Sequence, residues 1–199
     1  MEFSEVVRRR RMTRNFQEDS LERPVVDGLL TEALAAPSAG NTQGLEFVVL
    51  EGSEQTDRYW QATTDADWRT RSRRYEGMRR APVVVLPFSD PESYVDRYSE
   101  PDKIRVDRAE VEWVVPYWHV DGSFAVMTLL LGAADRSLGA SFLGNFRGET
   151  TLKKTLGVPA PRRWLGAVLL GHPAFPDPPS TSAARSRRTV TDAVHRDGW

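Results

Sequence analysis

The hydrophobic and polar positions along the chain follow two patterns, helical spacing and short continuous apolar runs. Apolar residues recur every three or four positions after Pro24, a residue that suits the first turn of a helix, and this predicts a helix through Ala35. Between Val120 and Ser137 the chain is apolar on most faces, which predicts a long buried helix. The other segments with helical character are Ser4–Arg11, Gln55–Met78 and Thr150–Leu156.

Strands are expected where short apolar runs stand between loop residues. The runs Phe47–Leu50 and Ala81–Leu86 are continuous rather than alternating, which is typical of strands covered on both faces. Leu165–Leu170 is the third clear strand, and Gly139–Leu143 is a short strand or a turn. Because helices and strands mix without a regular strand–helix–strand rhythm, the pattern favours an α+β fold around a small sheet.

Two segments fit neither pattern. The polar, tyrosine-rich segment Asp90–Asp107 is predicted to be a variable excursion from the core, and Pro173–Ser186 to be an extended tail rich in Pro, Ser and Ala. A length of 199 residues suits one domain that carries such additions. We therefore expect a single domain over residues 1–199, with the excursion at about 90–118 and the tail at about 174–199.

The composition excludes several classes of protein. With 27 basic and 28 acidic residues the net charge is −1, so the chain has no global basic field for nucleic acid. The absence of cysteine excludes disulfides, thiolate metal ligands and thiol catalysis, and with three distant histidines we expect no metal site. No apolar run approaches the roughly 20 residues of a membrane-spanning helix, and the N-terminus lacks a signal-peptide pattern. We expect a cytoplasmic protein with no membrane partner.

Arginine dominates the basic residues, because only three of the 27 are lysines. An arginine run is therefore weak evidence for a site by itself. One run, Arg8–Arg11, continues to Arg14, and Arg10 and Arg14 share a face if this segment is helical. The planar guanidinium binds phosphate through paired, charge-assisted hydrogen bonds. The run is thus either a phosphate site, a solvated basic turn or an arm for nucleic acid.

Two loops also carry candidate chemistry. Pro37–Gly44 lies between a helix and a strand, and its small residues let a planar ligand approach the backbone, while Asn41 and Gln43 offer donors and acceptors. The alternative is an ordinary loop that ends a helix. Phe142–Phe146 follows the long helix, and Gly144 there either admits a ring edge or forms a turn at the end of a strand.

A second arginine cluster, Arg185–Arg188, lies in the tail. It is either a disordered basic tail or part of a site, and the apolar residues Val190, Val194 and Trp199 that follow are not needed in a purely solvated tail. Nothing interleaves the first run, Arg8–Arg11, with the aromatic residues on which bases stack. Nucleic acid is therefore the least favoured partner.

Taken in order, these segments resemble the FMN-dependent nitroreductase family. The family pattern Arg-Arg-Ser-x-Arg-x-Phe stands here as Arg10–Phe16, and Ala-Pro-Ser-x-x-Asn-x-Gln-Pro stands as Ala36–Gly44. The turn aromatic–Leu–Gly–x–Phe follows the central helix at 142–146, and the family's Arg-Lys-Pro-Leu-x-x-Val-Val-His close stands as Arg187–His195. The resemblance covers nearly the whole chain, and four patterns in register are far more specific than any one of them.

The resemblance implies a nitroreductase-like fold. This fold has a small mixed sheet flanked by helices, a long buried central helix and a C-terminal extension that wraps the partner subunit of an obligate homodimer. The sequence departs from the family in three places. Met12 replaces a serine and removes a hydroxyl donor, Gly44 replaces a proline, and the segment Asp90–Asp107 matches no family pattern.

In this family FMN lies at the dimer interface. By resemblance, the arginines of the first run and of the tail would hold the phosphate and ribityl chain, and the loop 37–43 would contact the flavin ring of the partner subunit. Leu143 and Gly144 would lie near the reactive centre, and Arg14 near the pyrimidine side. The residues assigned to FMN are Arg10, Arg11, Met12, Arg14, Pro37, Ser38, Ala39, Asn41, Gln43, Leu143, Gly144, Arg185 and Arg187.

The implied activity is hydride transfer from NADH or NADPH through flavin N5 to a small electron-poor acceptor, a nitroaromatic or quinone, by a ping-pong mechanism. We assign no side-chain acid or base. Tyr117 and His119, before the central helix, are candidates for substrate contact or for simple packing. The alternatives are a specialised member (flavin destructase, dehalogenase or ring dehydrogenase) and a flavin-binding regulatory protein with little turnover. Arg10, Arg14 and Arg187 should converge in space, whereas Arg69–Arg74 should not.

Overall fold

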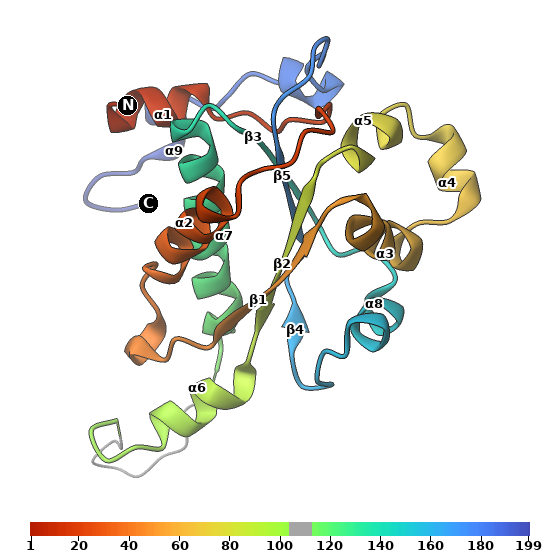
Figure 1. Cartoon of the computed structure of the whole chain (residues 1–199). Helices are drawn as coiled ribbons and strands as arrows, with labels where there is room; N and C mark the ends of the chain where they lie inside the picture. The colour runs from red at the N-terminus through yellow and green to blue at the C-terminus, as the bar shows by residue number, and fades with distance from the viewer. Residues whose placement is uncertain (104–112) are drawn as a thin grey trace.

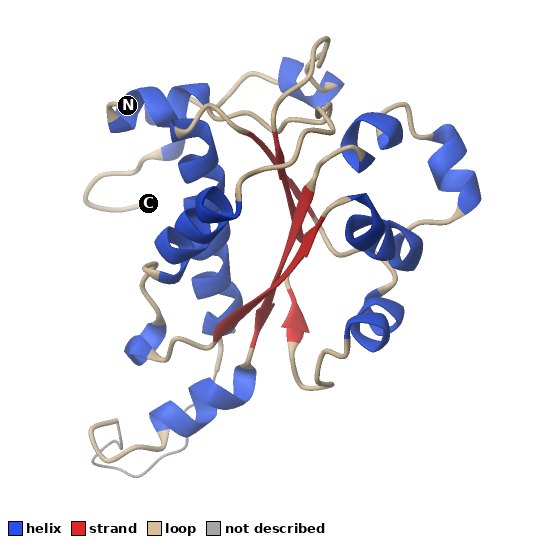
Figure 2. Cartoon of the chain, in the orientation of Figure 1, coloured by secondary structure: helices blue, strands red, loops and turns tan. Residues whose placement is uncertain are grey.

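The computed structural model describes residues 1–103 and 113–199, and it shows a five-stranded sheet with helices on both faces (Figures 1 and 2). The strand order is β1-β2-β5-β3, and β4 pairs with β2 beside this path. The strands are β1 (Leu45–Glu51), β2 (Val83–Ser89), β3 (Gly139–Leu143), β4 (Arg163–Trp164) and β5 (Ala167–Gly171).

Every ladder between these strands is antiparallel. The predicted α+β class is confirmed, and the parallel part of the expected mixed sheet is an isolated bridge in which Met12 pairs with Ala140. This bridge places the N-terminal arginine segment, residues 8–14, beside the first residues of β3. The topology therefore brings the first and third sequence patterns together at one edge of the sheet.

Helices cover the two faces of the sheet as two groups. In Figure 1, α1, α2 and α7 lie on one side of the strands and α3, α4, α5 and α8 on the other. The helices are α1 (Phe3–Arg9), α2 (Arg23–Leu34), α3 (Ser53–Thr63), α4 (Ala66–Arg71), α5 (Tyr75–Arg79), α6 (Pro91–Tyr98), α7 (Tyr117–Asp135), α8 (Glu149–Leu156) and α9 (Val190–Ala193), with short 3-10 turns η1 (Ala39–Asn41) and η2 (Thr181–Ala184).

The core has two parts, one on each face. On one face Trp60 and Leu152 pack against alternate residues of β2, and on the other face Leu29 and Leu129 pack against the intervening residues. All seven residues of β2 are buried. A strand buried on both faces needs apolar side chains at successive positions, which explains its continuous apolar run.

The helix expected over Gln55–Met78 is wrong as one element, because the segment forms three helices, α3, α4 and α5. The first break follows Thr63, where Thr64 adopts an extended conformation. Asp65 then caps the next helix, and its carboxylate accepts a hydrogen bond of 2.7 Å from the backbone N–H of Trp68. Aspartate at this position favours a new helix start over continuation.

The N-terminal helix also ends earlier than expected. α1 stops at Arg9, and Arg10 has an extended backbone with ψ of 122°. Arg10 and Arg14 therefore do not share a helical face, and the segment that joins them runs extended along β3. This corrects the helical arrangement that the four-residue spacing suggested.

The excursion contains a helix of its own, α6, which projects from the body of the molecule in Figure 1. Asp90 caps it through Oδ1, which accepts the N–H of Glu92, and Pro91 occupies its first turn. Residues 104–112 of the expected excursion lie outside the described residues. Within the described part of the chain, no helix has the length and apolarity to cross a bilayer.

Candidate functional site

The arginine segment is held against the sheet by backbone hydrogen bonds. The N–H of Thr13 donates to the carbonyl of Ala140 at 2.8 Å, next to the bridge of Met12. The guanidinium of Arg14 donates to the carbonyl of Met12 at 3.1 Å, and the backbone N–H of Arg14 donates to Oδ2 of Asp177 at 3.0 Å. The segment is therefore fixed between β3 and the start of the C-terminal tail.

Arg10 and Arg14 in this segment have guanidinium groups that the neighbouring described residues do not fully compensate. Nη1 of Arg10 is buried and has no hydrogen-bond partner among the described residues. Burial lowers the pKa of Arg14, and the neighbouring positive charge of Arg74 lowers it further, while Asp177 raises it. A buried donor without an acceptor and two facing cations both favour the binding of an anion.

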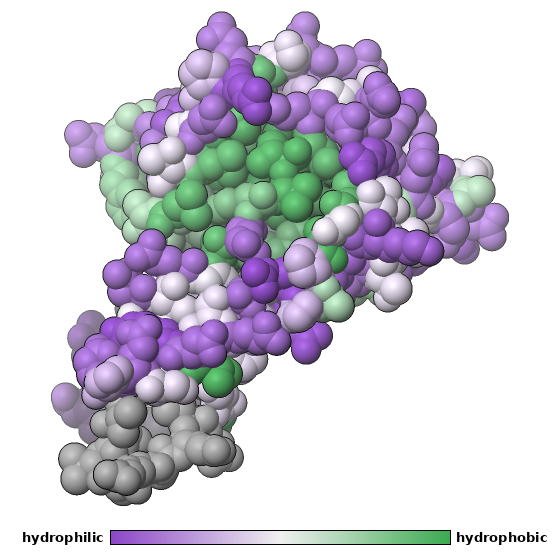
Figure 3. All heavy atoms as spheres, turned by 60° about the horizontal axis from the view of Figure 1, so that its bottom comes forward, coloured by the Kyte–Doolittle hydropathy of each residue, from purple (hydrophilic) through white to green (hydrophobic). Residues whose placement is uncertain are grey.

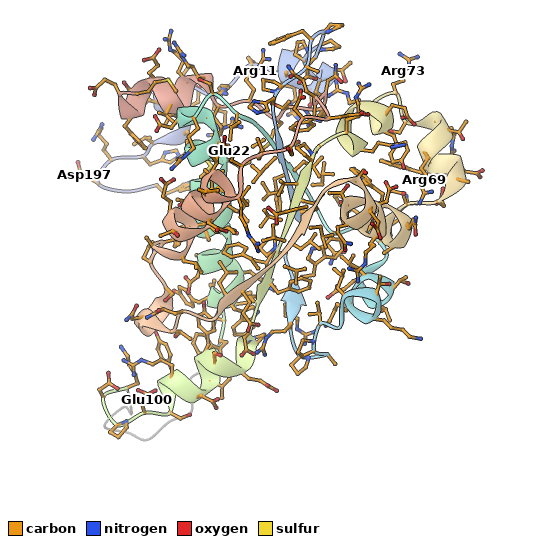
Figure 4. The ribbon with its side chains drawn as sticks, viewed as in Figure 1. Arg11, Glu22, Arg69, Arg73, Glu100 and Asp197 are labelled. Atoms are coloured by element: carbon orange, nitrogen blue, oxygen red, sulfur yellow. The ribbon has the colours of Figure 1, made fainter. Side chains whose placement is uncertain are left out.

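The closeness of Arg74 to Arg14 corrects the expectation that Arg69–Arg74 would stand apart as a group. Arg74 directly precedes α5 at its N-cap position, and its guanidinium also donates to the carbonyl of Pro178 at 3.4 Å. Other members of the run do stand apart from the arginine segment, as expected. Figure 4 shows Arg69 and Arg73 at α4 and the turn after it, apart from Arg11.

The remaining predicted arginines are not joined to this segment within one chain. Arg11 is exposed beside Arg10. Arg185 and Arg187 are exposed as well, and across residues 1–103 and 113–199 no hydrogen bond or ion pair links them to the arginine segment. Their convergence on one phosphate therefore stays a prediction.

Met12 packs against the core of the protein, and its assignment to FMN stays a prediction. Its side chain is half-buried and packs with the core group of α2 and α7. Its sulfur accepts a weak hydrogen bond of 3.4 Å from the N–H of Phe142. Methionine in place of the family's serine thus acts as a packing residue behind β3.

The predicted loop Pro37–Gly44 is held by short-range hydrogen bonds. The N–H of Gln43 donates to the hydroxyl of Ser38 at 2.9 Å, and the Gln43 amide donates to Oδ1 of Asn41 at 3.3 Å. Asn41 and Gln43 have left-handed backbone with φ of 54° and 55°. Both side chains are exposed, so a rigid turn presents them outward. Pro37, Ser38 and Gln43 border a small cavity of 150 Å³.

Two larger cavities meet at the end of β3. One of 540 Å³ is lined by α7 residues that include His119, and one of 440 Å³ is lined by Leu143, Gly144 and aromatic residues of α3. Phe142 and Trp164 line both. Figure 3 shows a broad apolar hollow on the side of the molecule that faces down in Figure 1. An apolar hollow with few polar groups suits a flat aromatic ligand.

Tyr117 and His119 form part of an aromatic group at the start of α7. The ring of Tyr117 lies 6.2 Å from that of Trp113, and the ring of His119 lies 6.1 Å from that of Trp118. His119 stands exposed at the edge of the 540 Å³ cavity. Partial burial of the imidazole lowers its pKa, and the charge of Arg163 lowers it further, so the neutral ring is favoured.

Sequence reasoning missed three residues that shape this region. Arg74 was expected not to converge with Arg10 and Arg14, and its position beside Arg14 depends on tertiary packing. Asp121 is a buried carboxylate, and its presence in the otherwise apolar start of α7 was the available signal. Tyr94 is fully buried, although its segment was predicted to be a polar, tyrosine-rich excursion from the core. In the described ranges, no group of three or more His, Asp or Glu side chains is placed to hold a metal ion.

The comparisons with known proteins agree with the fold. The model of the Nitroreductase family matches residues 7–172, so the chain belongs to the Nitroreductase family. A protein of Archaeoglobus fulgidus named "Putative NADH dehydrogenase/NAD(P)H nitroreductase" is 25% identical over 195 residues, which are 96% of this chain and 94% of that protein. The family and the name of this relative support an oxidoreductase in general.

Solved structures show the same fold. Nitroreductase CinD from Lactococcus lactis, in complex with nicotinic acid, superposes with a TM-score of 0.76 at 18% identity and 98% coverage of both chains. A "putative nitroreductase in complex with FMN" from Desulfovibrio desulfuricans has a TM-score of 0.71 at 23% identity, with 100% of this chain and 98% of that chain covered. The predicted nitroreductase-like fold is thereby confirmed.

Proposed function

We propose that this protein is an FMN-dependent NAD(P)H oxidoreductase that works as a homodimer. The observation that carries the proposal is the buried Nη1 of Arg10, which has no acceptor among residues 1–103 and 113–199, in a segment that also holds Arg14 beside Arg74. The resemblance assigns this segment to the phosphate of FMN, and a relative of the same fold is named as an FMN complex. The whole chain, residues 1–199, is proposed to act as one domain.

The donor set of this segment fits a phosphate. Nη1 of Arg10, which has no partner in the described part of the chain, would donate to a phosphate oxygen, and Arg14 and Arg74 would supply the charge that opposes the dianion. Binding would relieve the repulsion between Arg14 and Arg74. Arg11 at the exposed side of the segment would add charge, and Arg185 and Arg187 would close on the phosphate from the tail.

The hollow at the end of β3 fits the flavin ring. Leu143 and Gly144 border the 440 Å³ cavity, and the ring of Phe146, which also lines it, packs close to Gly144. The loop residues Pro37, Ser38, Ala39, Asn41 and Gln43 would contact the ring that the partner subunit holds. A homodimer is needed for this arrangement, and the exposed Val190, Val194 and Trp199 of the tail would be covered by the partner.

When bound, FMN supplies two-electron transfer from NAD(P)H to an electron-poor acceptor such as a nitroaromatic or a quinone, in the two half-reactions of a ping-pong scheme. The chain's own contribution is to orient the reactants and to exclude water. His119 lines the 540 Å³ cavity, and Tyr117 begins the same helix, α7, two residues earlier. Both would contact the acceptor. No side chain is assigned as a general acid or base, and the cytoplasm is the proposed location.

Steady-state kinetics test the activity. Protein reconstituted with FMN should oxidise NADH or NADPH in the presence of a quinone or nitroaromatic, and reciprocal plots at several acceptor concentrations should give parallel lines. Bound FMN without turnover would instead favour a flavin-holding regulatory protein. A protein that takes up no FMN overturns the proposal.

A further inference from the structure

A buried carboxylate joins three segments of the chain. Asp121, near the start of α7, has 7% of its surface exposed, and Tyr94 of α6 has 1%. Oδ2 of Asp121 accepts a hydrogen bond of 2.8 Å from the backbone N–H of Ala39 and one of 2.7 Å from the hydroxyl of Tyr94. Both donors converge on the same oxygen. Hydrogen bonds of this kind offset the cost of burying a charged group.

Helix α6 is attached to the loop 37–44 at two other points. The N–H of Asp90 donates to the carbonyl of Gly44 at 2.9 Å, and Nε of Arg97 donates to the carbonyl of Gly40 at 2.8 Å. Gly40 has a left-handed φ of 63°, as Asn41 and Gln43 of the same loop do. The beginning, middle and end of α6 are therefore all tied to the loop or to the carboxylate that holds it.

The ring of Tyr94 also explains why Gly44 stands where the family has proline. A Cβ atom at position 44 would lie 2.7 Å from Cε2 of Tyr94, closer than real Cβ contacts allow. Because Tyr94 is fully buried, its ring has little room to move aside. The glycine and the tyrosine are thus a complementary pair, one in the loop and one in the excursion.

We propose that Asp121 and Tyr94 are positioning residues, which fix the loop 37–44 and make the affinity for FMN depend on the excursion helix α6. The inference rests on the proposed function, since that function assigns this loop to the flavin of the partner subunit. Asp121 and Tyr94 act through the backbone at Ala39 and the surface of Gly44. Neither residue needs to touch the cofactor.

Tyr94→Phe tests the coupling with little disturbance, because it keeps the ring on Gly44 and removes one hydroxyl from Asp121. Tyr98→Phe is the matched control on the same helix, since the hydroxyl of Tyr98 makes no hydrogen bond within the described residues. In protein without FMN, we expect amide hydrogen exchange over residues 38–44 to be about tenfold faster in Tyr94→Phe than in the control. The dissociation constant for FMN should rise by about tenfold in Tyr94→Phe alone.

Substitution of Asp121 separates hydrogen bonding from charge. Asp121→Asn keeps an oxygen that accepts from both donors, so loop exchange and FMN affinity should stay within about twofold of the unsubstituted protein. Asp121→Ala removes both bonds, and its exchange should exceed that of Tyr94→Phe. If Asp121→Ala does not fold, the comparison of Tyr94→Phe with Tyr98→Phe still decides the question.

Two outcomes overturn different claims. Equal loop exchange and equal FMN affinity in the two tyrosine variants would overturn the positioning role, while the unsubstituted protein still bound FMN and the proposed function stood. Failure of the unsubstituted protein to bind FMN would overturn the proposed function and the cofactor part of this proposal. Faster loop exchange in Tyr94→Phe would still support the positioning of the loop by Asp121.

Discussion

The backbone N–H of Arg14 donates a hydrogen bond of 3.0 Å to Oδ2 of Asp177, which joins segments 163 residues apart in the sequence. The neighbouring Asn15 amide donates to the carbonyl of Pro176 at 2.8 Å. The start of the C-terminal tail is therefore fixed against the arginine segment of its own subunit. Residues further along the tail, from 181 on, are exposed.

Removal of this link should loosen the arginine segment. Asp177→Ala leaves a partly buried N–H without its acceptor, and we expect the free energy of unfolding to fall by about 1–2 kcal/mol. Asp177→Asn retains an oxygen acceptor and should lose less. Urea unfolding without FMN measures both, and equal stability of the three proteins would show that the hydrogen bond contributes nothing.

Arg10 should be costly for stability and necessary for FMN. Arg10→Met removes a buried donor for which the described residues supply no acceptor, so the protein without FMN should be as stable as the unsubstituted one or more stable. Its affinity for FMN should fall by about 10- to 100-fold, as expected for a charge-assisted hydrogen bond. Its affinity for riboflavin, which has no phosphate, should be unchanged.

Arg9→Met provides the control for Arg10. Arg9 is the adjacent arginine, it is exposed, and it pairs with Glu5 at 2.6 Å. Its substitution should alter neither affinity by more than about twofold, since exposed ion pairs contribute little. Isothermal titration with FMN and riboflavin distinguishes the variants. An equal loss of riboflavin and FMN binding in Arg10→Met would contradict a phosphate contact.

Met12 should matter for packing and little for the cofactor. Met12→Ser removes apolar contacts behind β3 and the sulfur that faces the N–H of Phe142, and we expect a loss of about 1–2 kcal/mol in the free energy of unfolding. Met12→Leu keeps the volume and should cost less. FMN affinity should stay within about threefold in both variants. Tighter binding by Met12→Ser would show that the family's serine position faces the cofactor here too.

The fold was predictable where one physical requirement dominates a segment. β2 is buried on both faces and α7 is the central helix, so each needs an apolar run that is visible in the sequence. The segment 53–79 was not predictable in this way, because its division into three helices depends on two local breaks. The first is the extended Thr64 with the cap at Asp65, and the second is the extended Ser72 that ends α4. All three are single polar residues within a helical pattern.

The candidate site was predictable in part for a similar reason. Patterns of adjacent residues, such as the arginine segment and the loop 37–44, were visible along the chain. Arg74 beside Arg14 and Tyr94 beside Asp121 were not, because each pair joins elements that only the folded chain brings together. The excursion looked variable and polar, although α6 carries the buried Tyr94.

His119 should titrate below its ordinary pKa of 6.5, because partial burial and the charge of Arg163 both oppose protonation. Since the folded-state pKa is lowered, the stabilising contribution of neutral His119 is present above pH 6.5 and is lost as the pH falls through the folded-state value. Arg163→Gln should raise the pKa part of the way back. Proton NMR of the imidazole measures both values, and a pKa at or above 6.5 in the unsubstituted protein would contradict this electrostatic account.

The visible absorption spectrum of the purified protein tests the central claim most directly. We expect a yellow protein with the two bands of oxidised flavin, released as FMN on denaturation, and we expect the bands to bleach when NADH or NADPH is added without oxygen. A later addition of quinone should restore them. A colourless protein that takes up no FMN from solution, or bound flavin that no nicotinamide donor reduces, would contradict the account.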